Sequence, residues 1–196
     1  MVVKVLVVEP LLPDVETERL WLRRWSAAQH SSALADINSD PRVMRYLGGA
    51  GLSAEESAEA AARYDAHWEQ YGFGLWAAME KSSGHVLGFI GLSHPLWNPE
   101  LSDEVEVGWR LRRSAWGRGL ATEGGAAALQ AGFEHLGLEE IIAIVDPHNL
   151  ASVAVTRKLG MSVRESRIHP QLGIPLDVMS ARAPSPGEPA HVTGSI

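Results

Sequence analysis

The chain contains 196 residues, with 17 lysines and arginines against 24 aspartates and glutamates, and it has no cysteine. This length suits one domain whose core is large enough to fold without disulfides or a structural metal. The missing cysteines exclude zinc ribbons, iron–sulfur clusters and thiolate nucleophiles, and the net charge of −7 argues against a general nucleic-acid-binding protein. No apolar run approaches the roughly 20 residues of a membrane helix, so we expect a soluble cytoplasmic protein with neither nucleic acid nor membrane as partner.

The two ends differ from the rest of the chain in composition. Residues 1–15 form an apolar extension that Pro10 and Pro13 interrupt, and it is either an extra edge strand or a partner-binding arm. Its apolar first eight residues make a homodimer contact a further option. Residues 184–196 hold three prolines and two glycines with few apolar anchors, which predicts a disordered tail. We therefore expect one domain at residues 16–183.

The first half of this domain predicts a strand followed by three helices. Residues 19–25 alternate apolar and polar side chains, which is typical of a half-buried strand. Ser53 and Glu56 form the S-x-x-E capping box that starts a long alanine-rich helix. The expected elements are a strand at 19–25, a helix from Ser26 towards Asn38, a short helix from Asp40-Pro41, and a helix from Ser53 to near Gly72.

The second half is richer in strands. The turn sequence Lys81-Ser82-Ser83-Gly84 predicts a hairpin between strands at 75–79 and 86–92. Residues 104–111, E-V-E-V-G-W-R-L, give the clearest strand pattern in the chain. Further expected elements are helices at 119–136 and 150–159 and strands at 140–145, 161–168 and 176–182. This order predicts an α+β (mixed α/β) domain.

Residues 104–123 carry the pattern with the most chemical content, E-V-E-V-G-W-R-L-R-R-S-A-W-G-R-G-L-A-T-E. A strand runs into a loop rich in arginine and glycine, and the loop opens a helix at Gly119. Gly117 and Gly119 let the backbone approach a ligand and direct several N–H groups into one concavity, where the helix dipole adds positive charge. Full charges come from Arg112, Arg113 and Arg118. This arrangement predicts a site for a polyphosphate.

Two other phosphate motifs are excluded at this loop, and one structural alternative stays open. The P-loop pattern G-x-x-x-x-G-K-[ST] is absent, and the dinucleotide pattern G-x-G-x-x-G would need glycine in place of Thr122. A glycine-rich turn also serves simply to pack a loop against a helix. Arg110 shares the strand face of Arg112, and a purely surface role stays open for it.

Several segments, in order along the chain, resemble the GNAT N-acetyltransferase superfamily. Residues 116–121, W-G-R-G-L-A, fit its acyl-CoA diphosphate loop, Q/R-x-x-G-x-G/A, with Gly119 and Ala121 at the two small positions. The tryptophan at the first position resembles the branch of ribosomal-protein alanine and serine N-terminal acetyltransferases. Matching segments are E-T-E-R-L-W-L-R at 16–23, D-P-R-V-M at 40–44, N-L-A-S at 149–152 and K-L-G-M at 158–161. The resemblance covers residues 16–182.

The resemblance implies the acyl-CoA N-acyltransferase fold, with a central, mostly antiparallel sheet that is splayed open and flanked by helices. Acetyl-CoA would lie in the opening as co-substrate, and no metal is implied. Backbone groups of Leu111 and Arg112 would contact the pantetheine, and those from Gly117 to Thr122 the diphosphate. The full set of implied acetyl-CoA residues is Leu111, Arg112, Trp116, Gly117, Arg118, Gly119, Leu120, Ala121, Thr122, Asn149 and Ser152.

Transfer to an amine requires a base for the ammonium proton and an acid for the leaving thiolate. The chain has no cysteine and the family transfers directly, so we expect no acetyl-enzyme. Glu106 and Glu104 are the candidate bases because they are two residues apart and so point to one face of the expected strand. His94 is a third candidate, and the alternative for both carboxylates is a solvent-facing position.

The acid of many family members is a tyrosine, and this chain has Thr156 at that place. The resemblance offers Ser152 as the replacement, although a serine on the first turn of a helix also serves as a cap. Three functions follow for the domain. They are acetylation of a protein or peptide N-terminal α-amine, which the branch favours, acetylation of a small amine (aminoglycoside, polyamine or amino-acid-like), and non-catalytic acyl-CoA binding.

The acidic helix after Ser53 bears on the choice of acceptor. It carries Glu55, Glu56, Glu59, Asp65 and Glu69 against Arg63 alone. Such a rim attracts a cationic amine or a basic peptide, although the pattern favours a solvated helix face that has no part in substrate binding.

Overall fold

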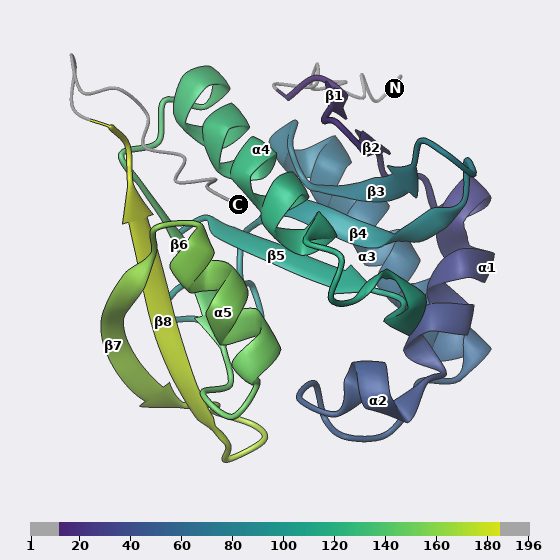
Figure 1. The fold of residues 1–196 in the computed structure, drawn as a ribbon. Coiled ribbons are helices and arrows are strands. Elements are labelled where there is room, and N and C mark those ends of the chain that lie inside the picture. Colours follow the sequence, from purple (N-terminus) through teal and green to yellow (C-terminus); the bar gives the residue numbers. More distant parts are fainter. Residues whose placement is uncertain (1–11, 185–196) are drawn as a thin grey trace, which may run out of the picture.

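A computed structural model of the chain describes residues 12–184, and the expectations for residues 1–11 and 185–196 lie outside this part. Its strands form one eight-stranded sheet in the order β1-β2-β3-β4-β5-β6-β8-β7 (Figure 1). The strands are β1 (Val15–Glu16), β2 (Leu20–Arg24), β3 (Leu75–Glu80), β4 (Val86–Ser93), β5 (Glu106–Leu111), β6 (Glu140–Val145), β7 (Ser162–Ile168) and β8 (Pro175–Arg182). The helices are α1 (Ala27–Asn38), α2 (Pro41–Met44), α3 (Ala54–Tyr71), η1 (Arg113–Ala115), α4 (Leu120–His135) and α5 (Leu150–Lys158).

Neighbouring strands run antiparallel with one exception in the middle of the sheet. β5 and β6 are parallel, and among the described residues their register joins a single pair, Glu106 and Ile142. Beyond that pair the two strands diverge (Figure 1). The mostly antiparallel, splayed sheet expected from the resemblance is therefore confirmed.

Helices cover both faces of the sheet. α1 and α3 contact each other on one face, whereas α4 packs against β4 and β5 on the other (Figure 1). Glycines allow this close packing of α4: a Cβ on Gly124 would lie 2.4 Å from Ile90 Cδ1, and one on Gly132 would lie 2.6 Å from Ile141 Cδ1. None of the helices in the described part of the chain is long and apolar enough to cross a membrane.

Large aromatic side chains fill the core on the β2–β4 side. Trp25, Trp68 and Trp76 are each at most 1% exposed and belong to one apolar cluster that reaches both faces of the sheet. Burying a side chain of this size contributes on the order of 3 kcal/mol. This tightly packed half of the sheet therefore holds β5, the strand that borders the opening, in place through its pairing with β4.

The expected elements are present, with one wrong boundary. In the capping box that starts α3, Ser53 Oγ accepts a hydrogen bond from the Glu56 N–H, and the Glu56 carboxylate accepts one from the Ser53 N–H. β5, however, begins at Glu106 and not at Glu104. The Glu104 N–H donates to the carbonyl of Leu101 in the turn before the strand, so Glu104 does not share a strand face with Glu106.

Candidate active site

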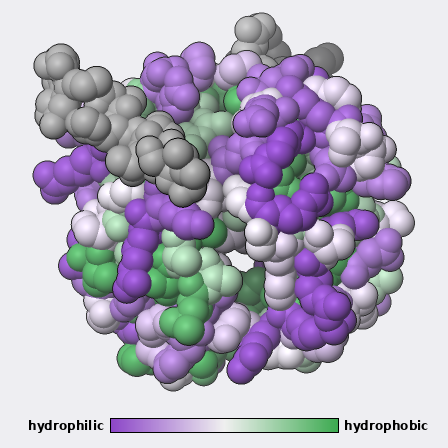
Figure 2. Space-filling view, in the orientation of Figure 1, coloured by the Kyte–Doolittle hydropathy of each residue, from purple (hydrophilic) through white to green (hydrophobic). Residues whose placement is uncertain are grey.

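The divergence of β5 from β6, called here the β5–β6 gap, exposes one edge of β5. The Arg112 N–H donates to the Leu87 carbonyl (2.8 Å), which continues the β4–β5 ladder. Because the peptide groups of a strand alternate in direction, those of Trp109 and Leu111 face the gap. In the same orientation as Figure 1, the molecular surface is hollowed near its centre (Figure 2). The gap therefore offers free backbone donors and acceptors along one strand.

Trp116 fixes the loop that follows β5. Its indole Nε1 donates a 2.8 Å hydrogen bond to the Leu111 carbonyl, and the residue is 46% exposed. The N–H of Leu111 is left facing the gap. Both backbone groups of Arg112 have protein partners, since its carbonyl accepts from the Ala115 N–H at 2.9 Å. Of the two predicted pantetheine contacts, the geometry favours Leu111.

The turn before α4 has the conformation that the glycines predict. Gly117 and Gly119 have φ angles of +69° and +77°, in the left-handed region that disfavours a side chain. Gly119 is the N-cap of α4 and supplies no side-chain cap. The first helical hydrogen bond runs from the Glu123 N–H to the Gly119 carbonyl, so the N–H groups of residues 120–122 have no partner within the helix. This cradle of backbone donors fits a diphosphate.

The arginines near the turn do not gather around it, contrary to expectation. The Arg118 guanidinium pairs with Glu80 on β3. Arg110 is not a surface residue: its guanidinium is buried, donates to Asn38 Oδ1 (2.7 Å) and lies over the Phe89 ring. The site expected for a diphosphate therefore offers backbone N–H groups and the helix dipole, and not the side chains of Arg110 and Arg118.

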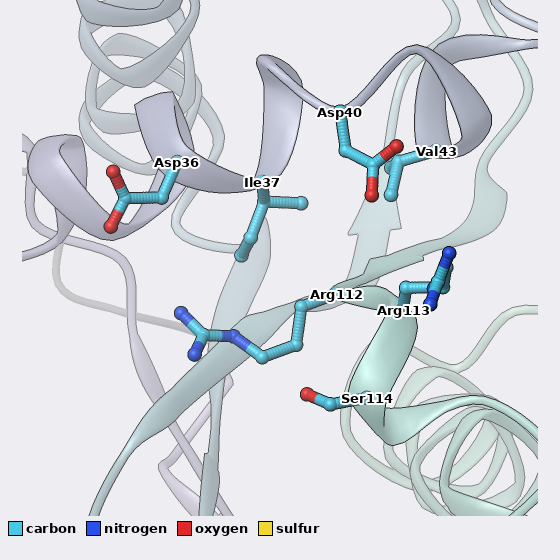
Figure 3. A pocket seen from close by; sticks show the side chains of 7 residues that line it. All are labelled: Asp36, Ile37, Asp40, Val43, Arg112, Arg113 and Ser114. Carbon is cyan, nitrogen blue, oxygen red and sulfur yellow. The ribbon is translucent and has the colours of Figure 1, made fainter.

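Arg112 and Arg113 line a pocket of about 250 Å³ on the α1 side of β5 (Figure 3). We call it the α1–η1 pocket. Its lining residues are Asp36, Ile37, Asp40, Val43, Arg112, Arg113 and Ser114. Carboxylates from the end of α1 and the start of α2 face guanidinium groups from the start of η1 (Figure 3). This pocket can therefore take polar groups of either charge.

Glu106 has the properties of a base that works near neutral pH. It lies at the closed end of the gap, where its strand still pairs with β6. Burial raises the pKa of its carboxyl group to about 7, and a hydrogen bond from Ser93 Oγ (3.4 Å) acts in the opposite direction. A carboxyl group with such a pKa can accept and release a proton under physiological conditions.

Glu104 and His94 are used in other contacts. The Glu104 carboxylate receives two hydrogen bonds from Arg164 on β7, at 2.6 and 2.8 Å. His94 Nδ1 donates to the Glu104 carbonyl at 2.8 Å, since a carbonyl can only accept. The expectation that Glu104 joins Glu106 on one strand face is wrong, because this ion pair draws Glu104 towards β7. Glu106 is the candidate base that the geometry favours.

Asn149 and Ser152 lie at the start of α5, on the β6 side of the gap. Asn149 Oδ1 accepts from the Ser152 N–H at 3.2 Å, so Asn149 caps the helix. The Ser152 side chain is partly exposed. Thr156 is fully buried and its hydroxyl donates to the Val153 carbonyl. The roles of Ser152 as acid and of Asn149 as acetyl-CoA contact remain predictions.

The sequence interpretation missed two features. A second pocket of about 270 Å³, the α2–β8 pocket, is formed by Arg45, Tyr46, Gly48, Gly49, Asp146, Leu172 and Ile174. These residues come from three loops with no shared local pattern, so no sequence signal identifies them. The second feature is a set of contacts among Thr17, Arg19 and Glu123. Its signal was present, because Thr17 and Arg19 belong to the E-T-E-R-L-W-L-R segment of the resemblance and Glu123 ends the pattern at residues 104–123.

Comparison with known proteins agrees with this geometry. A family model described as "Acetyltransferase (GNAT) domain" matches residues 19–162. The uncharacterized protein YkkB of Bacillus subtilis is 31% identical over 146 residues, which cover 74% of this chain and 83% of that protein.

Two solved structures share the fold. An acetyltransferase from Agrobacterium tumefaciens superposes with a TM-score of 0.74 at 27% identity, covering 88% of this chain and 95% of that one. RimJ of Mycobacterium smegmatis, in complex with CoA-disulfide, gives a TM-score of 0.71 at 16% identity, with 90% of both chains covered. With the family model, these likenesses show that the chain belongs to the GNAT family and is an acetyl-CoA-dependent acetyltransferase.

Proposed function

We propose that this enzyme moves the acetyl group of acetyl-CoA directly to the N-terminal α-amine of a protein or peptide. The observation that carries the proposal is Glu106, a buried carboxyl group with a pKa of about 7 at the closed end of the β5–β6 gap. A base with this pKa accepts a proton from an ammonium group without binding it irreversibly.

The residues of the gap fit acetyl-CoA. The left-handed Gly117 and Gly119 leave the N–H groups of residues 120–122 open towards a diphosphate, where a Cβ would strain the turn. The gap-facing N–H of Leu111 is placed to donate to the pantetheine or to the thioester oxygen. When bound, acetyl-CoA supplies the activated acetyl group, and everything else in the reaction falls to the protein.

The protein's work is the movement of two protons and the exclusion of bulk water. Glu106 takes the proton of the acceptor ammonium, directly or through one water, which frees the lone pair for attack. The Leu111 N–H stabilises the negative charge that develops on the carbonyl oxygen. As the C–S bond of the tetrahedral adduct breaks, Ser152, on the opposite side of the gap, donates its hydroxyl proton to the departing thiolate. The second proton of the adduct nitrogen restores the Ser152 hydroxyl, and Glu106 releases the first proton to solvent, so that the products are the amide and CoA-SH. No covalent acetyl-enzyme is needed for this sequence.

The acceptor side supports an extended substrate. The α1–η1 pocket and the α2–β8 pocket, of about 250 and 270 Å³, lie on either side of α2, since one includes Val43 and the other Arg45. Asp36 adds an exposed carboxylate to this surface, whereas the carboxylates of Asp40 and Asp146 already contact Arg42 and His148. A chain of several residues with a positively charged amino terminus suits two neighbouring hollows better than a compact amine does.

An acetyl-CoA consumption assay tests the proposal. The panel contains peptides with N-terminal alanine or serine, the same peptides with a blocked α-amine, and an aminoglycoside, a polyamine and free amino acids. We expect turnover only with peptides whose α-amine is free. Turnover confined to a small amine would contradict a peptide acceptor and identify a small-amine acetyltransferase. Acetyl-CoA binding without turnover on any amine would indicate a non-catalytic acyl-CoA-binding module.

A further inference from the structure

The carboxylate of Glu123, on the first turn of α4, is the centre of a hydrogen-bond network that reaches the N-terminal strands. Its Oε1 accepts from the Thr17 hydroxyl and from the Arg19 N–H at 2.7 Å, and its Oε2 accepts from Arg19 Nε at 2.6 Å. Three donors that lie more than a hundred residues earlier in the chain thus converge on one side chain. The start of α4 is tied to the segment that joins β1 and β2.

The same arginine also touches the glycine turn. Arg19 Nη1 donates to the Arg118 carbonyl at 2.8 Å, and a Cβ on Gly119 would lie 3.5 Å from Arg19 Nη2. The Arg118 side chain is held separately by Glu80. The Arg19 guanidinium therefore lies directly against the turn that precedes the open N–H groups of residues 120–122.

Electrostatics explain why this network matters for an anionic ligand. Burial acts to raise the pKa of Glu123, but the hydrogen bonds from Thr17 and Arg19 bring it below its ordinary value, so the carboxylate is charged at neutral pH. A carboxylate on the first turn of α4 repels a diphosphate bound at the N-terminus of that helix unless a cation neutralises it. Arg19 is that cation.

We propose that Arg19 is a positioning residue for acetyl-CoA binding, which orients the glycine turn through the Arg118 carbonyl and neutralises Glu123. The side chain of Arg19 is 43% exposed and that of Glu123 is 16% exposed, so the ion pair itself contributes little to folding stability. Its effect is expected in the affinity for the coenzyme.

Four variants separate the two roles of Arg19, which are to neutralise the Glu123 carboxylate and to orient the glycine turn. Arg19→Gln removes both, and we expect the dissociation constant for CoA to rise about tenfold, more at low salt. Arg19→Lys keeps the charge but loses the hydrogen bond to the Arg118 carbonyl, and an increase of about threefold is expected. The double variant, Arg19→Gln with Glu123→Gln, removes the carboxylate charge that Arg19→Gln leaves without a cation. It should therefore bind CoA more tightly than Arg19→Gln alone. Thr17→Val, the mildest change, removes one donor.

The measurement is titration calorimetry with CoA in the absence of any acceptor, together with amide hydrogen exchange of residues 117–123 in the free enzyme. Arg167→Gln is the matched control, because Arg167 also pairs with carboxylates, those of Glu165 and Glu100, but on β7. We expect Arg19→Gln and Thr17→Val to accelerate exchange of the turn and Arg167→Gln to leave both readouts unchanged. At saturating acetyl-CoA, kcat of the Arg19 variants should stay near that of the wild type.

Three results would overturn the proposal. One is an unchanged CoA affinity in Arg19→Gln whose thermal unfolding is normal. Another is a double variant that binds CoA no more tightly than Arg19→Gln, which would show that Arg19 does not act by neutralising Glu123. The last is a fall in kcat without a change in affinity, which would place Arg19 in the chemistry. If Arg19→Gln does not fold, Thr17→Val, which retains every charge, still decides the orienting role.

Discussion

The two regions that we propose for the coenzyme and for the acceptor present different kinds of chemical groups. The turn at residues 117–122 presents backbone N–H groups, and its shape depends on left-handed glycines. The region along α2, which we propose for the acceptor, presents side chains from helices and loops that surround two pockets. Backbone recognition restricts which residues can occupy a position, whereas side-chain recognition can change with a single substitution. The first region suits a coenzyme that must be bound in one way, and the second suits a substrate whose recognition a single substitution can change.

Glu106 lies at the closed end of the β5–β6 gap, and replacing it gives the largest expected effect. Glu106→Gln keeps the size of the side chain but cannot accept the ammonium proton, so kcat should fall by roughly 10² to 10⁴. In the wild type, kcat/KM should rise as pH increases through about 7, because only the ionised carboxylate is a base. This rise of kcat/KM with pH should be absent in Glu106→Gln and present in Glu104→Gln. CoA affinity should not change, and a rise that persists in Glu106→Gln would contradict the assignment.

The stability of the Glu106→Gln variant gives an independent check. The folded-state pKa of about 7 lies above the ordinary value of 4.5, so the folded protein binds this proton more tightly than the unfolded chain does. The resulting stabilisation is present in full below the lower pKa and is lost as pH rises through the higher one; it amounts to about 3 kcal/mol. In urea unfolding, wild type should lose stability relative to Glu106→Gln between about pH 5 and about pH 8. Equal pH dependence of the two proteins would contradict a buried carboxyl group.

Gly119 tests whether coenzyme binding depends on the backbone conformation of the turn. Gly119→Val forces a β-branched residue into a φ of +77°, so backbone strain must change the shape of the turn, although its Cβ would make only an ordinary contact, 3.5 Å from Arg19 Nη2. We expect CoA affinity to fall roughly 100-fold while the fold is retained at a cost of about 1–3 kcal/mol. Calorimetry measures the affinity. Gly137→Val is the control, because Gly137 has a φ of +64° at the other end of α4 and should lose stability alone.

The same contrast explains which parts of the structure the sequence predicts. α3 was predicted because its signals, a capping box and a left-handed Gly72, lie within the helix itself. The start of β5 was not, because the E-V-E-V alternation continues through Glu104 while a salt bridge to Arg164, sixty residues later, holds that side chain elsewhere. Local signals predict elements, and long-range contacts correct their ends.

In the candidate site too, features that depend on local sequence were predicted, and features that depend on distant residues were not. The Gly117 and Gly119 turn was predicted because a left-handed backbone needs glycine, whatever surrounds it. Arg110 was correctly placed on the face of Arg112, but its burial depends on Asn38 of α1, which covers that face. The α2–β8 pocket joins three separate loops, so no segment of sequence carries its pattern. Only the structure reveals the residues available to an acceptor.

Ser152 tests the side of the gap opposite Glu106. Ser152→Ala removes the hydroxyl that would protonate the thiolate but keeps the N–H that Asn149 caps, so α5 should persist. We expect kcat to fall about tenfold with acetyl-CoA affinity nearly unchanged. Ser31→Ala is the control, because that hydroxyl only donates to the Ala27 carbonyl within α1. Wild-type turnover in Ser152→Ala would leave Ser152 a helix residue without a chemical role.

The smallest effect is expected on the acceptor side, where binding rests on exposed side chains. Asp36 lines the α1–η1 pocket and is exposed, so its attraction for a positively charged amine is screened by solvent. Asp36→Asn should raise KM for the peptide about threefold and leave CoA affinity unchanged. Steady-state kinetics at two salt concentrations measure this, with Asp103→Asn, in the exposed turn before β5, as control. An equal effect of both variants would assign the change to net charge, and the α1–η1 pocket would then have no specific part in acceptor binding.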